Sequence, residues 1–106
     1  MINFNDLKKV DLRVAEVRKV EKVEDSKNLL KIMVSLGDEE RQIIAGLAQT
    51  HGKEDLEGEQ IVIVANLEPK TIFGMESQGM LLAAEENGDP VIIRPEKRTS
   101  PGAKIH

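Results

Sequence analysis

The stretch LLKIMVSLGDEERQIIAGL, residues 29–47, sets the fold class of this chain. From residue 30 to residue 36, apolar side chains alternate with Lys31, Met33 and Ser35, which is the two-residue period of a half-buried strand. The GDEE segment that follows fits a hairpin loop, and residues 41–45 supply the return strand. The stretch therefore predicts an antiparallel β-hairpin.

Two further segments extend the sheet. QIVIVANL, residues 60–67, is a nearly continuous β-branched run, which is typical of a buried central strand. Residues 10–23 hold five valines, and three of them (Val14, Val17 and Val20) recur at every third position, as on a helix. Because valine is stiff at χ1 and packs well on a pleated surface, we expect a long strand with a bulge or bend that shifts its facing midway.

The other segments are short. Asn3 or Asn5 is expected to cap an opening helix with Asp6 in its first turn, and a helical turn is expected near residues 53–56. Residues 69–79 are interpreted as a loop leading into a strand at 80–84, EENGDP as a turn, and VIIRP and residues 103–105 as short strands. Five or more short strands with little helix predict an all-β protein, either a small antiparallel barrel or a sandwich.

Length and composition set the protein class. The chain has 106 residues, so we expect a single domain over residues 1–106 with one core. It has no cysteine, which excludes disulfides and thiolate zinc sites and agrees with a reducing compartment. No apolar run approaches the ~18 residues of a membrane span, and the N-terminus lacks the layout of a signal peptide. We therefore expect a soluble cytoplasmic protein with no membrane partner.

The sequence predicts no catalytic residue, metal site or cofactor. Its two histidines, His51 and His106, lie far apart, and neither is embedded in a metal-ligand spacing or beside a nucleophile. The acidic pairs at 39–40 and 85–86 fall in expected turns, where charge keeps a loop solvated. Gly74 and Gly79 are not followed by the Lys-Ser of a phosphate-binding loop. The hypothesis is a non-enzyme.

The charges are unevenly distributed along the chain. The formal net charge is −4, which argues against nucleic acid as a partner. Residues 8–31, however, hold eight basic and five acidic residues, whereas residues 54–89 hold nine acidic residues and a single base, Lys70. An anionic partner would therefore lie on the N-terminal half and near Lys70. A solvated surface of mixed charge is the alternative.

Residues 74–80 have an unusual composition, because Met75 and Met80 lie next to Gly74 and Gly79. Glycine allows a partner to approach the backbone closely, and an exposed thioether offers adaptable apolar contact. Methionine also commonly fills cores, so the pattern leaves open whether this segment is a contact surface.

The stretch NLEPKTIFGMESQGMLLAA, residues 66–84, resembles the signature of the tRNA-binding domain family, which runs Asn-Leu-x-Pro, Gly-x-x-Ser-x-Gly-Met and then an apolar strand. The family includes the domain appended to methionyl-tRNA synthetases, free-standing structure-specific tRNA-binding proteins and the endothelial-monocyte-activating polypeptide domain. DLRVAEV, GDEERQIIAGLA and SPGAKI resemble its first strand, second hairpin and closing segment. The resemblance thus covers nearly the whole chain.

The resemblance implies a five-stranded OB-fold barrel with short helical segments, and with N- and C-terminal extensions that pair two copies into a homodimer. It implies binding of tRNA by shape, at its outer corner, with little sequence preference. It also implies a partner, the catalytic part of a methionyl-tRNA synthetase, joined covalently or not. Such a domain raises the local tRNA concentration and takes no part in the chemistry.

The resemblance also assigns residues by position. Asn66 would fix the loop by side-chain hydrogen bonds, and Lys70 would contact a phosphate. The glycines would permit close backbone approach, and we expect the charged and hydroxyl groups to share one face. The predicted tRNA-binding residues are Lys31, Arg41, Asn66, Lys70, Gly74, Ser77, Gly79 and Met80. Arg13 could join them or form a structural ion pair.

Three departures from the family pattern reduce the positive charge of the loop. Relatives commonly have lysine where Glu68 stands, and a base where Thr71 and Phe73 stand. Because the chain has only two phenylalanines and no other aromatic residue, stacking of single-stranded bases is nearly excluded, whereas a folded RNA can be recognised by its phosphates and shape. Two alternatives stay open. One is an export-type chaperone that binds unfolded peptide in the same groove, and the other is a dimerisation module without RNA affinity.

Overall fold

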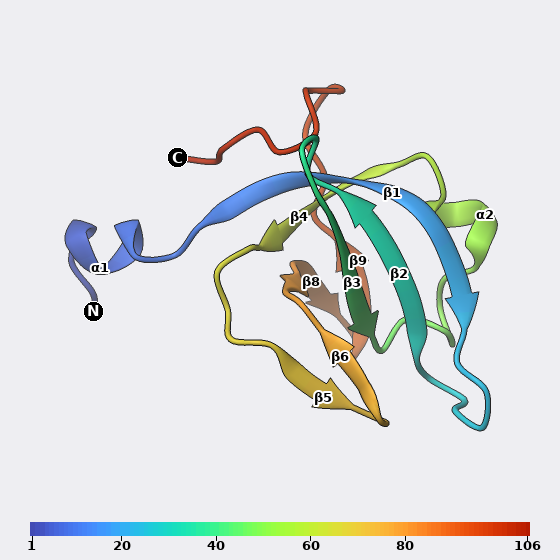
Figure 1. The fold of residues 1–106 in the computed structure, drawn as a ribbon. Coiled ribbons are helices and arrows are strands. Elements are labelled where there is room, and N and C mark those ends of the chain that lie inside the picture. Colours follow the sequence, from blue (N-terminus) through green and yellow to red (C-terminus); the bar gives the residue numbers. More distant parts are fainter.

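The computed structural model describes all 106 residues and contains one curved five-stranded sheet, two separate hairpins and two short helices (Figure 1). All neighbouring strands of the sheet are antiparallel, in the order β3-β2-β1-β4-β7. The strands of this sheet are β1 (Leu12–Lys22), β2 (Leu30–Ser35), β3 (Glu40–Ala45), β4 (Gln60–Val64) and β7 (Met80–Leu81).

Strand β1 is the long central strand, and it is bulged as predicted. Its first half pairs with β4 and its second half with β2, and the register with β2 shifts between Val17 and Lys19. The extra residue resets which side chains face inward. Val17 and Val20 are consequently both buried although they are three positions apart, which explains the helix-like spacing of the valines.

The core lies inside this curved sheet. All five residues of β4 are buried, as expected for a central strand. Helix α2 (Lys53–Leu56), at the predicted helical turn, lies against β1 and places Leu56 in the core with no exposed surface. The core cluster consists of Ala15, Val17, Val20, Leu30, Ile32, Val34, Leu36, Ile43, Leu47, Leu56, Ile61, Ile63 and Ala65.

Polar side chains bring the open edge of β3 to the segment before β7. The backbone N–H of Gln42 donates to the side-chain oxygen of Gln78 at 2.9 Å, and the N–H of Gln78 donates to the carbonyl of Gln42 at 2.8 Å. The sheet thus becomes a nearly closed five-stranded barrel. The predicted all-β OB-type fold is confirmed.

Residues 70–77 form a hairpin, so the assignment of the whole segment 69–79 as a loop was wrong. Strands β5 (Lys70–Ile72) and β6 (Met75–Ser77) pair in register around the two-residue turn Phe73–Gly74. The second hairpin, β8 (Ala83–Glu86) with β9 (Asp89–Ile92), contains the turn predicted in EENGDP. The first was missed because a left-handed turn with phenylalanine at its first position has no recognisable sequence signal.

The two chain ends extend the barrel differently. Helix α1 (Phe4–Lys8), capped by Asn3 as one of the two predicted candidates, projects away from the barrel (Figure 1). The C-terminal segment runs beside the start of β1, where the N–H of Val14 donates to the carbonyl of Ala103. The strand predicted at 103–105 reduces to one bridge, between Lys104 and Arg13. Neither helix is long and apolar enough to cross a membrane.

Candidate functional site

A groove of about 490 Å³ opens between the β5–β6 hairpin and the edge of the barrel. Four of the eight predicted site residues line it, and they come from three different elements. The groove is lined by Ile44, Leu67, Glu68, Lys70, Ile72, Ser77, Gly79 and Met80.

Ser77 holds the hairpin against β3. Its side chain is buried, and its hydroxyl accepts a hydrogen bond from the N–H of Ile44 at 3.0 Å and donates to the carbonyl of Gly79 at 3.2 Å. Gln42 adds a bond from its side-chain amide to the carbonyl of Glu76. Ser77 therefore forms part of the groove wall, and its hydroxyl is already engaged within the protein.

Glycine is required at the two predicted positions for different structural reasons. At Gly79 the φ angle is +146°, and a Cβ would lie 2.9 Å from the carbonyl oxygen of Val64, so this residue lets the chain pack against β4. At Gly74 the φ angle is +79°, and a Cβ would meet no atom within 4 Å. Gly74 is therefore required by the turn alone and lies at the exposed tip, outside the groove lining.

Lys70 and Met80 give the groove its accessible chemistry. Lys70 is exposed and takes part in no ion pair, and the Met80 side chain is 50% exposed. Leu67 and Ile72 add apolar surface, while Glu68 places one carboxylate at the same groove. The site therefore offers one ammonium group beside an apolar wall, with a single acidic group opposing it.

The expectation that Lys31 and Arg41 share one face is wrong. Lys31 pairs with Ile44 across β2 and β3, whereas Arg41 pairs with Val34, which is fully buried. Because directly paired residues point to the same face and successive residues alternate, Arg41 lies on the core side and Lys31 on the outer side. The strand register between β2 and β3 decides which face each side chain occupies. The spacing of residues in the sequence does not define that register.

Arg41 is engaged in holding the barrel together. Its guanidinium donates to the carbonyl of Ala65 and pairs with Glu39 at 2.7 Å. Lys31 takes part in no ion pair, but it lies in a second hollow near the tip of the β5–β6 hairpin, outside the groove.

Asn66 fixes the N-terminal connection and not the loop. Its side-chain amide donates to the carbonyl of Lys9 at 2.7 Å, and its side-chain oxygen accepts from the N–H of Asp11 at 2.8 Å. Arg13 likewise has a structural partner, Asp11, at 2.9 Å. The hydrogen bond from Arg13 lowers the pKa of Asp11 below its ordinary value, even though burial opposes the shift.

Sequence reasoning missed half of the groove lining. Leu67 and Ile72 are apolar residues inside an otherwise polar segment, and that contrast was a usable signal. Ile44 had none, because it belongs to the barrel and reaches the groove only when the hairpin covers β3. Gln42 and Gln78, which hydrogen-bond to each other, are 36 residues apart in the sequence, and no local pattern reveals this contact.

The lining of the groove contains few chemically reactive groups. Its one hydroxyl, on Ser77, is buried and has two partners, and no imidazole or thiol lines it. No group of three or more histidine, aspartate or glutamate side chains in the structure is arranged to hold a metal ion.

The chain was compared with known proteins. The family model "Putative tRNA binding domain" matches residues 12–104. The chain is 45% identical to methionine–tRNA ligase of Archaeoglobus fulgidus and 46% identical to that of Thermotoga maritima, each over 98% of this chain and 16% of the relative. It thus spans about a sixth of these curated relatives, on their C-terminal tRNA-binding domain and outside the catalytic part.

Two solved structures have the same fold over the whole chain. A MetRS-related protein from Pyrococcus horikoshii superposes with a TM-score of 0.94 at 36% identity, covering 100% of this chain and 98% of that one. The chaperone CsaA of Bacillus anthracis superposes with a TM-score of 0.91 at 31% identity, covering 100% and 99%. The family assignment made from residues 66–84 is confirmed: this chain belongs to the tRNA-binding domain family and is related to the non-catalytic tRNA-binding domain of methionyl-tRNA synthetase.

Proposed function

We propose that the groove beside the β5–β6 hairpin binds tRNA by its shape, with little sequence preference, as an accessory domain of methionyl-tRNA synthetase. The observation that carries this proposal is the gathering of Lys70, Ser77, Gly79 and Met80 around one groove in a member of the tRNA-binding domain family. The catalytic part of the synthetase, attached or separate, would be the functional partner, in the cytosol.

The chemistry of the groove suits a folded RNA better than a single strand. Lys70 can contact a phosphate, and the apolar wall at Leu67 and Met80 can pack against ribose and exposed base edges. No aromatic ring lines the groove for bases to stack on. Folded RNA presents phosphates and 2′-hydroxyls in a fixed outline, which such a surface can recognise.

Pairing of two copies through the N-terminal arm would double the RNA-binding surface. We define the arm as residues 1–10, and its large apolar side chains are unusually exposed: Ile2 by 71%, Phe4 by 70%, Leu7 by 48% and Val10 by 42%. Beside them a hollow of about 250 Å³ is lined in part by Leu12 and Ile105. An apolar strip that projects from the barrel is covered most simply by a second copy, giving a homodimer.

A second candidate function is peptide binding in the same groove, as in a chaperone. Its support is the likeness to the CsaA structure and the low positive charge of the groove, where Glu68 opposes Lys70. In that case the apolar wall formed by Leu67, Ile72 and Met80 would contact extended polypeptide.

Titration of labelled tRNA with the protein at several salt concentrations separates the two functions. We expect affinity to fall as salt rises and to exceed that for single-stranded RNA of equal length. Lys70→Gln should reduce the slope of log affinity against log salt by about one, because one phosphate contact is lost. Lys97→Gln removes the same charge from a separate hollow at the C-terminal segment and should leave the slope close to that of the wild type.

Affinity that ignores salt, or equal effects of Lys70→Gln and Lys97→Gln, would contradict tRNA binding at the groove. Tighter binding of an unfolded polypeptide than of tRNA would favour the chaperone function. The dimer is tested separately by light scattering. Phe4→Ser with Leu7→Ser should halve the mass in solution, whereas a wild-type monomer would exclude pairing through the arm.

A further inference from the structure

The turn of the β8–β9 hairpin contains an asparagine followed by a glycine. Of the asparagines in this chain, only Asn87 precedes glycine. The carbonyl carbon of an asparagine side chain can be attacked by the backbone nitrogen of the next residue, and a side chain on that next residue hinders the attack. Glycine has no Cβ, so the Gly88 nitrogen is unhindered. Asn87 is therefore the asparagine at which this reaction meets the least steric resistance.

Both reacting groups of this turn are free and exposed to solvent. Neither the side chain of Asn87 nor the N–H of Gly88 takes part in a hydrogen bond. Both residues are exposed, and a Cβ added at Gly88 would meet no atom within 4 Å. Asn66 differs, because both its amide nitrogen and its side-chain oxygen are hydrogen-bonded.

The hairpin that carries the turn is attached to the barrel only near its base. The backbone of Leu82 bonds to Val62 and Ile93, and Ile92 packs on the core. All four residues of β8 are exposed. A segment with few tertiary contacts opens locally at a low cost in free energy. Such opening lets the Asn87 side chain rotate towards the Gly88 nitrogen.

We propose that Asn87 is a modification site, where the side-chain amide is lost spontaneously and the residue becomes aspartate or isoaspartate. The Gly88 nitrogen forms a bond to Cγ of Asn87, its proton passes through solvent to the amide nitrogen, and that nitrogen leaves as ammonia. A cyclic imide results. Water then opens the ring, giving aspartate when it attacks Cγ and isoaspartate when it attacks the backbone carbonyl. The net reaction consumes water and releases ammonia, with no oxidation or reduction.

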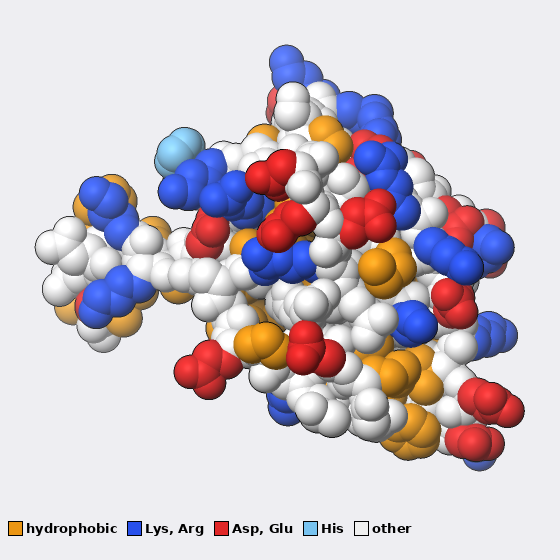
Figure 2. Space-filling view, viewed as in Figure 1, with side chains coloured by type: hydrophobic (Ala, Val, Ile, Leu, Met, Phe, Trp, Pro, Cys, Tyr) orange, Lys and Arg blue, Asp and Glu red, His pale blue; other side chains and the backbone are white.

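Either product changes the tip of the hairpin. Residues 83–92 hold three acidic residues and no base, and two of these, Glu86 and Asp89, are paired next to the turn. Over the face of the barrel in Figure 2, by contrast, acidic and basic side chains are interspersed. A new carboxylate at residue 87 therefore adds repulsion between like charges. Isoaspartate also inserts a further carbon into the main chain, which is incompatible with the two-residue turn.

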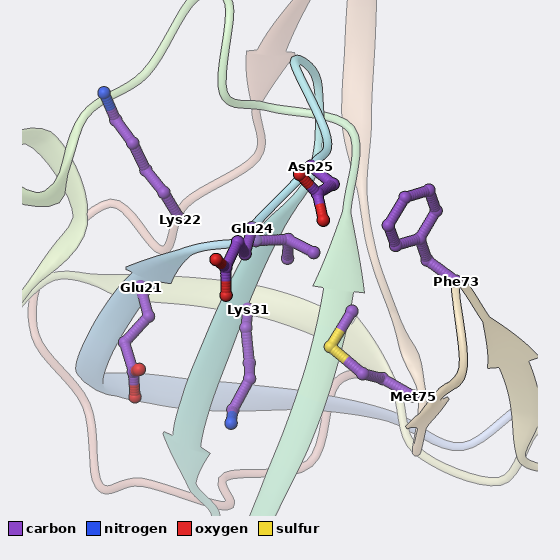
Figure 3. Close-up of a pocket in the computed structure, with 8 residues that line it drawn as sticks. Glu21, Lys22, Glu24, Asp25, Lys31, Phe73 and Met75 are labelled. Carbon is purple, nitrogen blue, oxygen red and sulfur yellow. The ribbon is translucent and has the colours of Figure 1, made fainter.

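The β5–β6 hairpin provides a matched comparison within the same molecule. Its turn also has positive φ at both residues, but the first residue is Phe73, drawn in Figure 3, which has no amide to react. Phe73→Asn creates a second Asn-Gly pair in this turn. Because the β5–β6 hairpin is held to the barrel by Ser77, Gln42 and Gln78, it should open less readily. The new pair should therefore react more slowly than Asn87.

The test is incubation of the purified protein in neutral buffer without RNA, so its outcome is independent of the proposed tRNA function. Peptide mass spectrometry follows the mass gained when the amide NH₂ is replaced by OH, and fragmentation assigns the change to a residue. Methylation by an isoaspartyl-specific methyltransferase distinguishes isoaspartate from aspartate. A synthetic peptide EENGDP gives the rate of the unfolded turn. We expect Asn87 to convert within roughly tenfold of the peptide rate, while Asn66 stays intact.

Two variants complete the experiment. Gly88→Ala should slow conversion at residue 87 roughly tenfold, because the added methyl group hinders the attacking nitrogen. In Phe73→Asn the new pair should convert roughly tenfold more slowly than Asn87. Asn87 that remains intact while the peptide is consumed overturns the proposal. Conversion of Asn66 at the same rate, an unchanged rate in Gly88→Ala, or equal rates at the two turns would also contradict it.

Discussion

The β5–β6 and β8–β9 hairpins have the same type of turn, but the local sequence favours this turn in only one of them. Each joins its strands through two residues with positive φ, as in a type I′ turn: +53° and +79° at Phe73–Gly74, and +53° and +86° at Asn87–Gly88. Asn-Gly is the favoured sequence for this turn, whereas phenylalanine is disfavoured at its first position.

What holds each hairpin in place differs accordingly. The β8–β9 strands make no side-chain hydrogen bond to the barrel; the hairpin is joined to it through the backbone at Leu82, and Ile92 packs on the core. The β5–β6 hairpin is held by the Ser77 hydroxyl and by the amides of Gln42 and Gln78. One hairpin follows from its own sequence, and the other is imposed by contacts with the barrel. The imposed hairpin is the one that lines the groove proposed to bind tRNA.

The largest effect on stability is expected at Gly79, which lets the chain after the β5–β6 hairpin pack against β4. Gly79→Ala combines an unfavourable backbone angle with a Cβ 2.9 Å from a carbonyl oxygen, and should lower the free energy of unfolding by about 3 kcal/mol. Gly88→Ala meets no atom within 4 Å and should cost only about 1 kcal/mol. Chemical denaturation measures both. Equal losses would show that the two hairpins are attached alike.

Ser77→Ala should cost about 2 kcal/mol, because the buried N–H of Ile44 loses its acceptor. The β8–β9 hairpin has no equivalent hydroxyl, so Ser100→Ala, at an exposed position whose hydroxyl makes no hydrogen bond, serves as the control. That variant should change stability by less than ~0.5 kcal/mol. If Ser77→Ala lowers the stability no more than Ser100→Ala does, the Ser77 hydroxyl is not what holds the β5–β6 hairpin to the barrel.

Exchanging the turn residues should have opposite effects in the two hairpins. Asn87→Phe places a bulky residue at φ +53° and should destabilise the protein by about 1 kcal/mol. Phe73→Asn relieves the same strain and should stabilise it by up to about 1 kcal/mol. Thermal and denaturant unfolding give the sign. Destabilisation by Phe73→Asn would mean that the ring contributes packing that its exposure does not suggest.

The smallest effect is a pH dependence outside both hairpins. Because the folded-state pKa of Asp11 is lowered by Arg13, its contribution to stability is present above its ordinary pKa of 3.8 and is lost as pH falls through the folded value. Asp11→Asn should therefore be slightly less stable than the wild type at neutral pH and lose that deficit below pH ~4. The turn exchanges change no ionisable group, so their difference should persist over the same range. A deficit of Asp11→Asn that grows in acid would contradict the assigned ion pair.

The sequence predicted the elements that obey local rules. The alternation in residues 30–36, the β-branched run of β4, the valines of β1 and the turn at Asn87–Gly88 all led to correct elements. It failed for residues 69–79, where phenylalanine in a left-handed turn hides a hairpin. For the site, four of the predicted residues between 70 and 80 line one groove, whereas Arg41 and Asn66 lie outside it and hydrogen-bond to distant parts of the chain.

By itself, the sequence determined the all-β class, the long strands and the family, since these depend on periodicity, residue type and a local motif. Only the tertiary structure decided which charges are free. The strand register turned Arg41 toward the core and Lys31 outward, and closure of the barrel engaged the Ser77 hydroxyl while leaving Lys70 and Phe73 accessible. The physical reason is that a side chain's availability depends on partners brought together from far along the chain, and those partners are set by folding, not by the neighbouring residues.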